Sequence, residues 1–337
     1  IYSYRHGKKE NPWLEINGSR VEKISRNLSL EVLGQRKAVA SVVDIILRAT
    51  TGLTGMQHSS GTRPRGVMLF AGPTGVGKTE MAKAMAREIF GTEEAMLRFD
   101  MSEYSQSHSD QRLLGAPPGY VGYDAGGELT NAVKAKPFSI LLFDEIEKAN
   151  PTILDKFLQI LDDGRMTDSR GETVYFTECL IIFTSNIGMN KGMINEDFLT
   201  ENLSYEELDQ KVRQALKENW RPEFVNRIGQ NVIVFDYIRE TEAEEILRKQ
   251  LNKICSLIEA QKNIRMSWID DSRFYRKLKD HCMQNLQYGG RGIGNVVEYY
   301  FLTPLGREIA FETLMAGNRI RLQDIEENDI SVKLIWE

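Results

Sequence analysis

The chain has 337 residues, of which 43 are basic and 48 acidic, and its net charge is −5. Hydrophobic residues make up 41% and charged residues 27%, a composition that is typical of globular proteins and excludes a disordered or fibrous chain. A domain usually contains about 100–200 residues, so the length favours two domains. The negative net charge provides no general attraction to nucleic acid, and we expect no nucleic-acid partner.

The three cysteines, Cys179, Cys255 and Cys282, lie far apart and lack the paired spacing of zinc or redox motifs. We expect each to be a small buried side chain. No segment approaches the ~18 apolar residues of a membrane-spanning helix, so we expect no membrane partner. The chain begins at Ile1 in a polar segment without an apolar signal core, which predicts a fragment of a longer cytoplasmic protein.

The N-terminal part of the chain predicts a lead-in, a helix and a loop, in that order. Residues 1–25 are polar, and glycine and proline interrupt any periodicity, which indicates a linker or lead-in. Apolar residues recur with helical spacing over 32–47. Glycine, proline and hydroxyl residues over 50–65 indicate a loop.

Three short, uniformly apolar runs follow, and each predicts a buried strand that ends in polar residues. They cover residues 67–70, 140–143 and 180–183. Helical patterns cover residues 80–90, 126–135 and 151–162. Uniformly apolar strands that alternate with helices indicate an α/β fold, in which helices cover both faces of a parallel sheet. Ligands bind at the carboxyl ends of the strands in such sheets, so we expect a site there.

The pattern changes near residue 236, where we expect a smaller α+β domain to begin. Helical spacing and short alternating runs share this region. The expected helices cover 241–261, 278–286 and 294–315, and the expected strands cover 264–269 and 330–336. We therefore predict a lead-in over 1–27, a large α/β domain over 28–236 and a small C-terminal domain over 237–337.

The first strand is followed by a sequence that matches the phosphate-binding loop pattern G-x-x-x-x-G-K-[ST], and the flanking strand and helix are the context that this loop requires. Its glycines let backbone N–H groups turn towards phosphate oxygens, its lysine reaches the β- and γ-phosphates, and Thr79 is suited to bind Mg²⁺. We therefore predict ATP and Mg²⁺ as cofactors. The predicted cofactor-binding residues are Gly72, Pro73, Thr74, Gly75, Val76, Gly77, Lys78 and Thr79.

Polar residues also end the second and third apolar runs. Asp144 follows the second run, where a carboxylate is suited to hold Mg²⁺ through water, the Walker B role. The adjacent Glu145 is predicted to be the general base for the attacking water. Asn186 follows the third run, where its amide is predicted to position that water. Asparagine is common in turns at strand ends, so its assignment depends on the other two residues.

Seven motifs occur in one order along the chain. They lie at residues 72–79, 100–103, 115–123, 142–149, 161–165, 184–186 and 221–228. This series resembles the second AAA+ module of the Clp family of protein unfoldases and disaggregases, over about residues 28 to 320. The resemblance implies an AAA+ P-loop domain followed by a small C-terminal lid, assembled as a hexameric ring that acts on protein substrates.

The resemblance also implies roles for residues outside the phosphate-binding loop. Tyr120 and Val121 match the pore loop, where an aromatic ring between mobile glycines grips a threaded polypeptide. Residues 163–170 resemble the secondary pore loop. Val32 and Leu33 match the segment that packs on adenine.

Two arginines have implied catalytic roles. Arg227 matches the arginine finger, which stabilises charge at the nucleotide of the neighbouring subunit, and Arg221 is the competing candidate. Arg291 matches the lid residue that contacts the γ-phosphate from the same chain. Around it, Gly290 replaces the usual alanine, and residues 292–295 replace a more basic run that contains proline. The extra glycines predict a weak start for the following helix.

Two absences bear on function. Residues 189–205 lack the apolar-Gly-Phe tripeptide by which proteolytic relatives dock a peptidase, which argues against a peptidase partner. The sequence contains one P-loop, whereas many relatives have two.

The leading hypothesis is an ATP-driven, ring-forming protein remodeller that threads polypeptide through a central pore. One alternative is an AAA+ motor that acts on DNA or on a nucleoprotein assembly, which the acidic charge and Tyr120 disfavour. The other is a nucleotide-dependent assembly switch that changes shape without translocation and does not need Tyr120.

Overall fold

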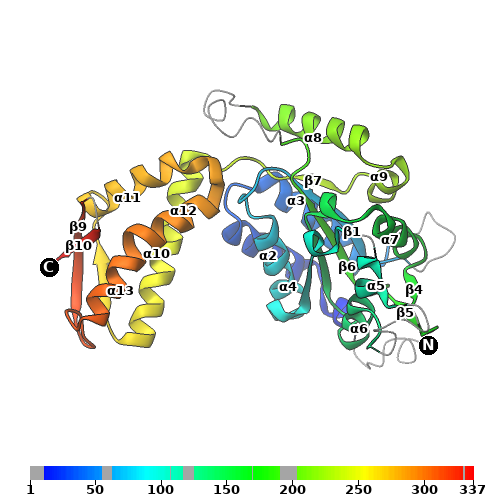
Figure 1. Cartoon of the computed structure of the whole chain (residues 1–337), viewed down its shortest axis with the longest axis horizontal. Coiled ribbons are helices and arrows are strands. Elements are labelled where there is room, and N and C mark those ends of the chain that lie inside the picture. Colours follow the sequence, from blue (N-terminus) through cyan, green and yellow to red (C-terminus); the bar gives the residue numbers. More distant parts are fainter. Residues whose placement is uncertain are drawn as a thin grey trace. The chain divides into compact units, whose positions relative to one another are not determined.

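The computed structural model describes residues 11–54, 63–106, 108–116, 125–168, 170–189, 203–328 and 331–337. These residues form two compact units (Figure 1). The first contains the described residues up to Gly72, those from 77 to 189 and those from 203 to Asp236. The second contains Pro73–Val76 and the described residues of Tyr237–Glu337. No helix in the described ranges is both long and apolar enough to cross a membrane.

The first unit is built on a five-stranded sheet in the order β2-β3-β6-β1-β7, and every neighbouring pair is parallel. The three central strands are those that the apolar runs predict. The two outer strands are additional: β2 is largely half-buried, and β7 has only three residues. The strands are β1 (Gly66–Ala71), β2 (Met96–Asp100), β3 (Ile140–Asp144), β6 (Leu180–Ser185) and β7 (Val232–Val234).

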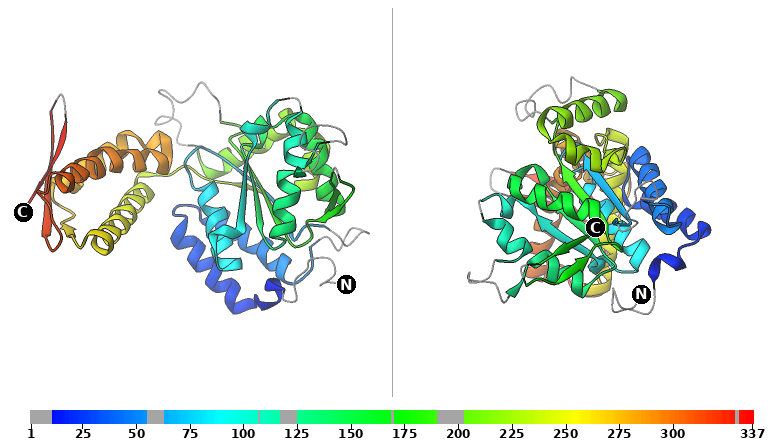
Figure 2. Two further views of the ribbon diagram at one scale, coloured as in Figure 1. Left: turned by 60° about the horizontal axis from the view of Figure 1, so that its bottom comes forward. Right: turned by 90° about the vertical axis from the view of Figure 1, so that its right-hand side faces the viewer.

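Helices cover both faces of this sheet, which confirms the predicted α/β class (Figures 1 and 2). They are α2 (Gly18–Glu31), α3 (Arg36–Thr50), α4 (Lys78–Phe90), α5 (Ser109–Leu114), α6 (Glu128–Ala135), α7 (Pro151–Asp163), α8 (Tyr205–Asn219) and α9 (Pro222–Ile228). The described part also contains the 3₁₀ turns η1 (Pro12–Glu15), η2 (Glu93–Ala95), η3 (Met101–Tyr104) and η5 (Ile146–Lys148), and an antiparallel hairpin of β4 (Arg165–Thr167) and β5 (Thr173–Tyr175).

A row of phenylalanine rings crosses the sheet near its carboxyl edge. Phe143 stacks on Phe99 and on Phe183, with ring centroids 5.4 Å apart in both pairs. Phe183 also packs edge-on against Phe224 of α9, at 5.2 Å. The first three rings belong to β2, β3 and β6, and each directly precedes a polar residue. The aromatic row therefore joins the ends of three strands to one helix through core packing.

Residues 11–31 form two helical elements and not the irregular lead-in that the sequence predicts. The second of them, α2, packs against α3 and α4. Trp13 in η1 is only 1% exposed. Its indole N–H donates to the carbonyl of Glu178 at 3.1 Å, and its ring meets Phe90 edge-on. This segment is therefore part of the core of the first unit.

The residues that favour an irregular segment mark the starts of these elements. Pro12 occupies the first position of η1, where its fixed φ suits a helical turn and its missing N–H is not needed. Asn17 caps α2, because its side chain accepts the N–H of Arg20 at 3.0 Å. Glycine and proline at such positions start helical elements, so they do not identify a linker.

Trp13→Ala is expected to destabilise the first unit by about 3–5 kcal/mol, the usual cost of removing a large buried aromatic side chain. Leu14→Ala is the matched control, since Leu14 is 81% exposed, and we expect it to change stability by less than about 0.5 kcal/mol. Urea unfolding followed by circular dichroism measures both. Equal midpoints for the two variants would contradict a core role for this segment.

The second unit combines helices with a three-stranded sheet in the order β10-β9-β8. β8 pairs with β9 in parallel, and β10 pairs with β9 antiparallel. The expected strands and the first two expected helices are present, and β9 is additional. The helix expected over 294–315 is instead α12, a π-helical turn and α13, and it ends at Ala310. The elements are α10 (Glu240–Lys262), β8 (Arg265–Trp268), α11 (Arg273–Gln284), the 3₁₀ turn η6 (Leu286–Tyr288), α12 (Gly289–Val297), a π-helical turn (Glu298–Leu302), α13 (Thr303–Ala310), β9 (Arg319–Glu327) and β10 (Val332–Trp336).

The glycines before residue 295 lie inside α12, although they predict a weak start for this helix. Gly292 has a packing role, because a Cβ there would lie 2.4 Å from the carbonyl oxygen of Asn285. Gly289 has a φ of +59°, which a residue with a side chain adopts only with strain. These glycines therefore let α12 begin directly against the preceding turn.

Candidate functional site

The phosphate-binding pattern covers the loop between β1 and α4 and the first two residues of α4. Gly72, Gly75 and Gly77 have φ values of +138°, +77° and +101°, a region that favours glycine. A Cβ on Gly72 would lie 2.5 Å from the carbonyl oxygen of Phe235, and one on Gly77 would lie 2.8 Å from Cγ1 of Val32. Any side chain at either position would therefore displace the loop.

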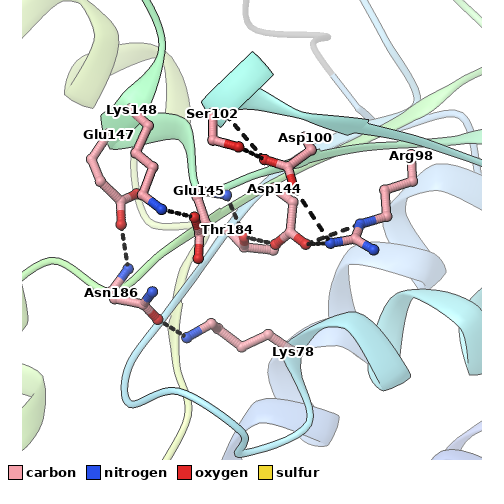
Figure 3. A network of polar contacts seen from close by, with 10 residues as sticks. All are labelled: Lys78, Arg98, Asp100, Ser102, Asp144, Glu145, Glu147, Lys148, Thr184 and Asn186. Atoms are coloured by element: carbon pink, nitrogen blue, oxygen red, sulfur yellow. Dashed lines mark hydrogen bonds and ion pairs between the residues drawn. The ribbon is translucent and has the colours of Figure 1, made fainter. Parts of the chain in front are cut away.

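Lys78 links the start of this loop to the end of β6. It is the first residue of α4 and is buried. Its ammonium donates to the carbonyl of Gly72 at 2.6 Å and to Oδ1 of Asn186 at 2.7 Å (Figure 3). Two predicted site residues that are 108 positions apart in the sequence are thus in direct contact.

Asp144 ends β3, and both of its carboxylate oxygens have partners. Oδ1 accepts a hydrogen bond from the hydroxyl of Thr184 in β6. Oδ2 accepts from Nε and Nη2 of Arg98 in β2, at 3.1 and 2.6 Å (Figure 3). Asp144 is buried, whereas half of the Arg98 side chain is exposed.

Glu145 has an unusual backbone for a residue with a side chain. Its φ of 56° and ψ of 52° lie in the left-handed region. Its N–H donates to the hydroxyl of Thr184 at 3.0 Å, and its carboxylate forms an ion pair with Lys148. This hydrogen-bonded pairing raises the pKa of the Lys148 ammonium. The predicted base is therefore paired with a cation in this structure.

Two further contacts order the polar edge. The backbone N–H of Asn186 donates to Oε1 of Glu147 at 3.1 Å. At the end of β2, Asp100 accepts from both the hydroxyl and the N–H of Ser102, at 2.6 and 3.0 Å. The hydroxyl hydrogen bond is the main reason that the pKa of Asp100 lies below its usual value.

The segment that resembles an adenine-packing element lies beside the phosphate-binding loop. Val32 is buried at the C-terminal end of α2 and faces Gly77, and Leu33 is half-buried. The side chain of Gln35 donates to the carbonyl of Asp236 at 2.9 Å and accepts its N–H at 2.8 Å. This pair fixes the segment to the last residue of the first unit.

The two candidate finger arginines both pair with aspartates of α7. Arg227 in α9 pairs through Nε with Asp162, at 2.5 Å. Arg221, directly before α9, pairs through Nη1 with Asp155. The structure thus gives both arginines acidic partners on α7, away from the contacts of Lys78.

Arg291 lies on α12 of the second unit and is exposed. The preceding residue, Gly290, donates its N–H to the carbonyl of Gly75 in the phosphate-binding loop at 2.8 Å, so Arg291 lies beside this loop. Tyr120 and Val121 lie outside the described residues. The expected secondary pore loop, residues 163–170, falls largely on the end of α7 and on β4, with Ser169 outside the described residues.

A family model for the AAA domain (Cdc48 subfamily) matches residues 63–231, which make up half of the chain. The chain belongs to the AAA domain family. The match includes the phosphate-binding loop, the acidic end of β3, Asn186 and Arg227.

Curated relatives of this AAA domain include three chaperone proteins of cyanobacteria. The chain is 47% identical to "Chaperone protein ClpB 1" of Synechococcus elongatus over 241 residues, 72% of the chain and 26% of that protein. It is 42% identical to "Chaperone protein ClpB" of Leptolyngbya boryana over 295 residues, 87% of the chain and 32% of that protein. It is 38% identical to "Chaperone protein ClpB 2" of Synechocystis over 321 residues, 93% of the chain and 34% of that protein. The chain therefore spans about a quarter to a third of the length of these relatives.

The residues of this AAA domain fit a nucleotide and Mg²⁺. The loop glycines form a cradle that a Cβ would distort, as an approach of phosphate to backbone N–H groups requires. Thr79, at the start of α4, and Asp144 supply oxygen donors, the ligand type that Mg²⁺ prefers. Lys78 supplies the cation beside the loop.

Arg98 and Thr184 belong to this site, although sequence reasoning gave neither a role. Arg98 points from a strand that the apolar pattern does not reveal, because charged and apolar residues alternate there. Thr184 stands two residues before Asn186, and its hydroxyl could have been suspected, since Thr184 and Ser185 are the polar end of an otherwise apolar strand.

Lys78→Ala is expected to weaken nucleotide binding by at least about thirtyfold, since removing one partner from a buried charged contact costs ~2–5 kcal/mol. The control is Lys83→Ala on the same helix, whose side chain is 40% exposed and pairs with Glu80. Titration with a fluorescent ATP analogue measures both affinities. Equal affinities for the two variants would show that Lys78 does not contact the phosphates.

Proposed function

We propose that this AAA domain binds and hydrolyses ATP with Mg²⁺. The contact of Lys78 with Asn186 carries the proposal, because it joins the phosphate-binding loop to the strand end beside Asp144 and Glu145. In this proposal Thr79 and Asp144 hold Mg²⁺, which neutralises phosphate charge when bound. Glu145 accepts the proton of the attacking water, and Asn186 orients that water.

Glu145 must leave Lys148 to act as a base, because its carboxylate then faces the attacking water instead of the ammonium. Both side chains are partly exposed, at 34% and 52%, and exposed ion pairs contribute little to stability. The pair can therefore open at low cost when nucleotide binds.

Glu145→Gln is expected to retain ATP binding and to reduce hydrolysis at least about hundredfold, the usual effect of losing a general base. Phosphate release and binding of a fluorescent ATP analogue, measured on one preparation, separate these two effects. Glu88→Gln is a control, since Glu88 lies in the last turn of α4 and its Oε1 accepts from Asn27 of α2. Turnover by Glu145→Gln at the control rate would show that the base lies elsewhere.

We further propose that hydrolysis requires an oligomeric ring, in which Arg227 completes the site of a neighbouring subunit. Its pair with Asp162 is partly exposed, at 39% for Arg227, and exposed ion pairs contribute little to stability, so Arg227 can exchange this partner for phosphate. Arg221, paired with Asp155, is the competing candidate. Arg291 is proposed to contact the γ-phosphate from its own chain.

A mixing experiment tests the contribution of Arg227 to a neighbouring site. Arg227→Ala and Glu145→Gln chains are each expected to be nearly inactive alone. Mixed assemblies should recover part of the activity, below the wild-type level, because intact Arg227 then reaches sites that retain Glu145. Light scattering on the same samples reports assembly. No recovery in assemblies that contain both chains would contradict action on a neighbour, and Arg221→Ala tests the competing residue in the same way.

The named relatives are chaperone proteins, and we propose that this chain remodels protein substrates by threading them past Tyr120. The described helices on either side of Tyr120 support this proposal. Glu128 of α6 accepts hydrogen bonds from Tyr104 and from Arg112 of α5, at 2.7 Å for Nε of Arg112. The Tyr104 carbonyl accepts the N–H of Asn150, just beyond η5. Helices α5 and α6 are thus tied, through Tyr104, to the element that follows Glu145.

Tyr120→Ala is expected to retain ATP hydrolysis and to abolish ATP-dependent unfolding of a fluorescent protein substrate, because the ring that grips the chain is lost. Tyr123→Ala is the control within the same segment. Unchanged unfolding by Tyr120→Ala would exclude threading past this residue. A motor on DNA would instead show hydrolysis stimulated by DNA, and an assembly switch would show no unfolding in the wild type.

A further inference from the structure

Thr184 occupies the position between the two acidic residues of the candidate site. The register of β3 and β6 pairs Phe143 with Phe183, so the next residues, Asp144 and Thr184, lie side by side. Thr184 is 1% exposed. Its hydroxyl contacts both the carboxylate of Asp144 and the backbone N–H of Glu145 (Figure 3).

The direction of these two hydrogen bonds follows from their chemistry. A backbone N–H can only donate, so the oxygen of Thr184 accepts from Glu145. The single hydroxyl hydrogen is then available to Asp144, and a carboxylate accepts it. One hydroxyl therefore satisfies a donor and an acceptor on consecutive residues. An apolar side chain of the same shape can do neither.

The backbone of Glu145 needs such a partner. Its left-handed φ and ψ values are uncommon for a residue with a side chain, and they persist only where the surroundings hold them. The N–H of Glu145 is one restraint on that conformation, and Thr184 is its hydrogen-bond acceptor. Since the backbone conformation sets the direction of the side chain, the same bond bears on where the Glu145 carboxylate can reach.

We propose that Thr184 is a positioning residue for nucleotide hydrolysis, which fixes the Asp144 carboxylate and the Glu145 backbone in one arrangement. The inference rests on the proposed function, in which Asp144 holds Mg²⁺ and Glu145 accepts a proton from the attacking water. The two residues that hold Asp144 differ. Arg98 is half exposed and can move into solvent, whereas Thr184 is buried in a central strand. Thr184 is therefore the fixed partner of Asp144.

Two comparisons test the hydroxyl group: Thr184→Val with Thr184→Ser, and Thr184→Ala with Thr184→Ser. Thr184→Val keeps the shape and removes the hydroxyl, while Thr184→Ser keeps the hydroxyl and removes the methyl. Thr184→Ala differs from Thr184→Ser only in the hydroxyl, so this second pair decides the question if the valine variant does not fold. Thr130→Val is the matched control, because Thr130 is fully buried and its hydroxyl donates to the carbonyl of Gly127 at 3.0 Å.

The measurements are affinity for a fluorescent ATP analogue with and without Mg²⁺, and the steady-state kinetics of ATP hydrolysis. For Thr184→Val we expect unchanged affinity without Mg²⁺, a smaller gain in affinity when Mg²⁺ is added, and a kcat about tenfold lower with little change in KM, as loss of a buried hydrogen bond predicts. Thr184→Ser should stay within about twofold of the wild type, and Thr130→Val should match it in each measurement, since neither loses a contact to the acids.

Several outcomes would overturn the positioning role. If Thr184→Val hydrolyses ATP like the wild type, the hydroxyl is not needed. If Thr184→Ser is as impaired as Thr184→Ala, the hydroxyl alone does not support hydrolysis and a positioning role of the hydroxyl is contradicted. A wild-type chain that assembles but never hydrolyses ATP would contradict the proposed function instead. In that case the effect of Mg²⁺ on nucleotide affinity still decides whether Thr184 acts on Asp144.

Discussion

Parallel pairing of β1, β3 and β6 is the constraint on which the site depends. Parallel strands in register end at the same edge, so the residues that follow each apolar run meet there. Lys78 follows β1, Asp144 ends β3, and Asn186 follows β6. None of these residues is near another in the sequence. The buried interior of the sheet thus determines the geometry of the polar edge.

The polar groups at this edge satisfy one another through hydrogen bonds and ion pairs in the structure. Lys78 binds a carbonyl and an amide, Arg98 binds Asp144, and Lys148 binds Glu145. Such contacts limit the cost of placing charges at a partly buried edge. They also mean that the side chains proposed for catalysis each have a partner to exchange when nucleotide arrives.

The sequence was sufficient for the central strands and for the phosphate-binding loop, because both depend on local signals. Uniformly apolar runs identify β1, β3 and β6, and the loop pattern depends on glycines whose positive φ values the structure contains. The sequence predicts a lead-in where the structure has η1 and α2. Trp13 is buried by contacts with Glu178 and Phe90, and no local pattern reveals contacts of this kind.

The contacts of Arg98 and Thr184 with Asp144 were out of reach for the same reason. They join residues 46 and 40 positions apart, and they depend on which strands are neighbours and in what register. A sequence motif identifies a residue type at a position, whereas a hydrogen bond requires the position of its partner. The roles of Arg227, Arg291 and Tyr120 remain predictions, because they concern a nucleotide, a neighbouring subunit or a threaded chain.

The phenylalanine row has a consequence for how variants of this protein will behave in genetic experiments. Phe99, Phe143 and Phe183 each precede an edge residue, and the row continues to Phe224, three positions before Arg227. A smaller side chain in this row leaves a void that the surroundings fill only in part, and strand ends shift as they relax. Conditional, temperature-sensitive alleles should therefore concentrate at these rings, with activity failing at temperatures where the chain is still folded.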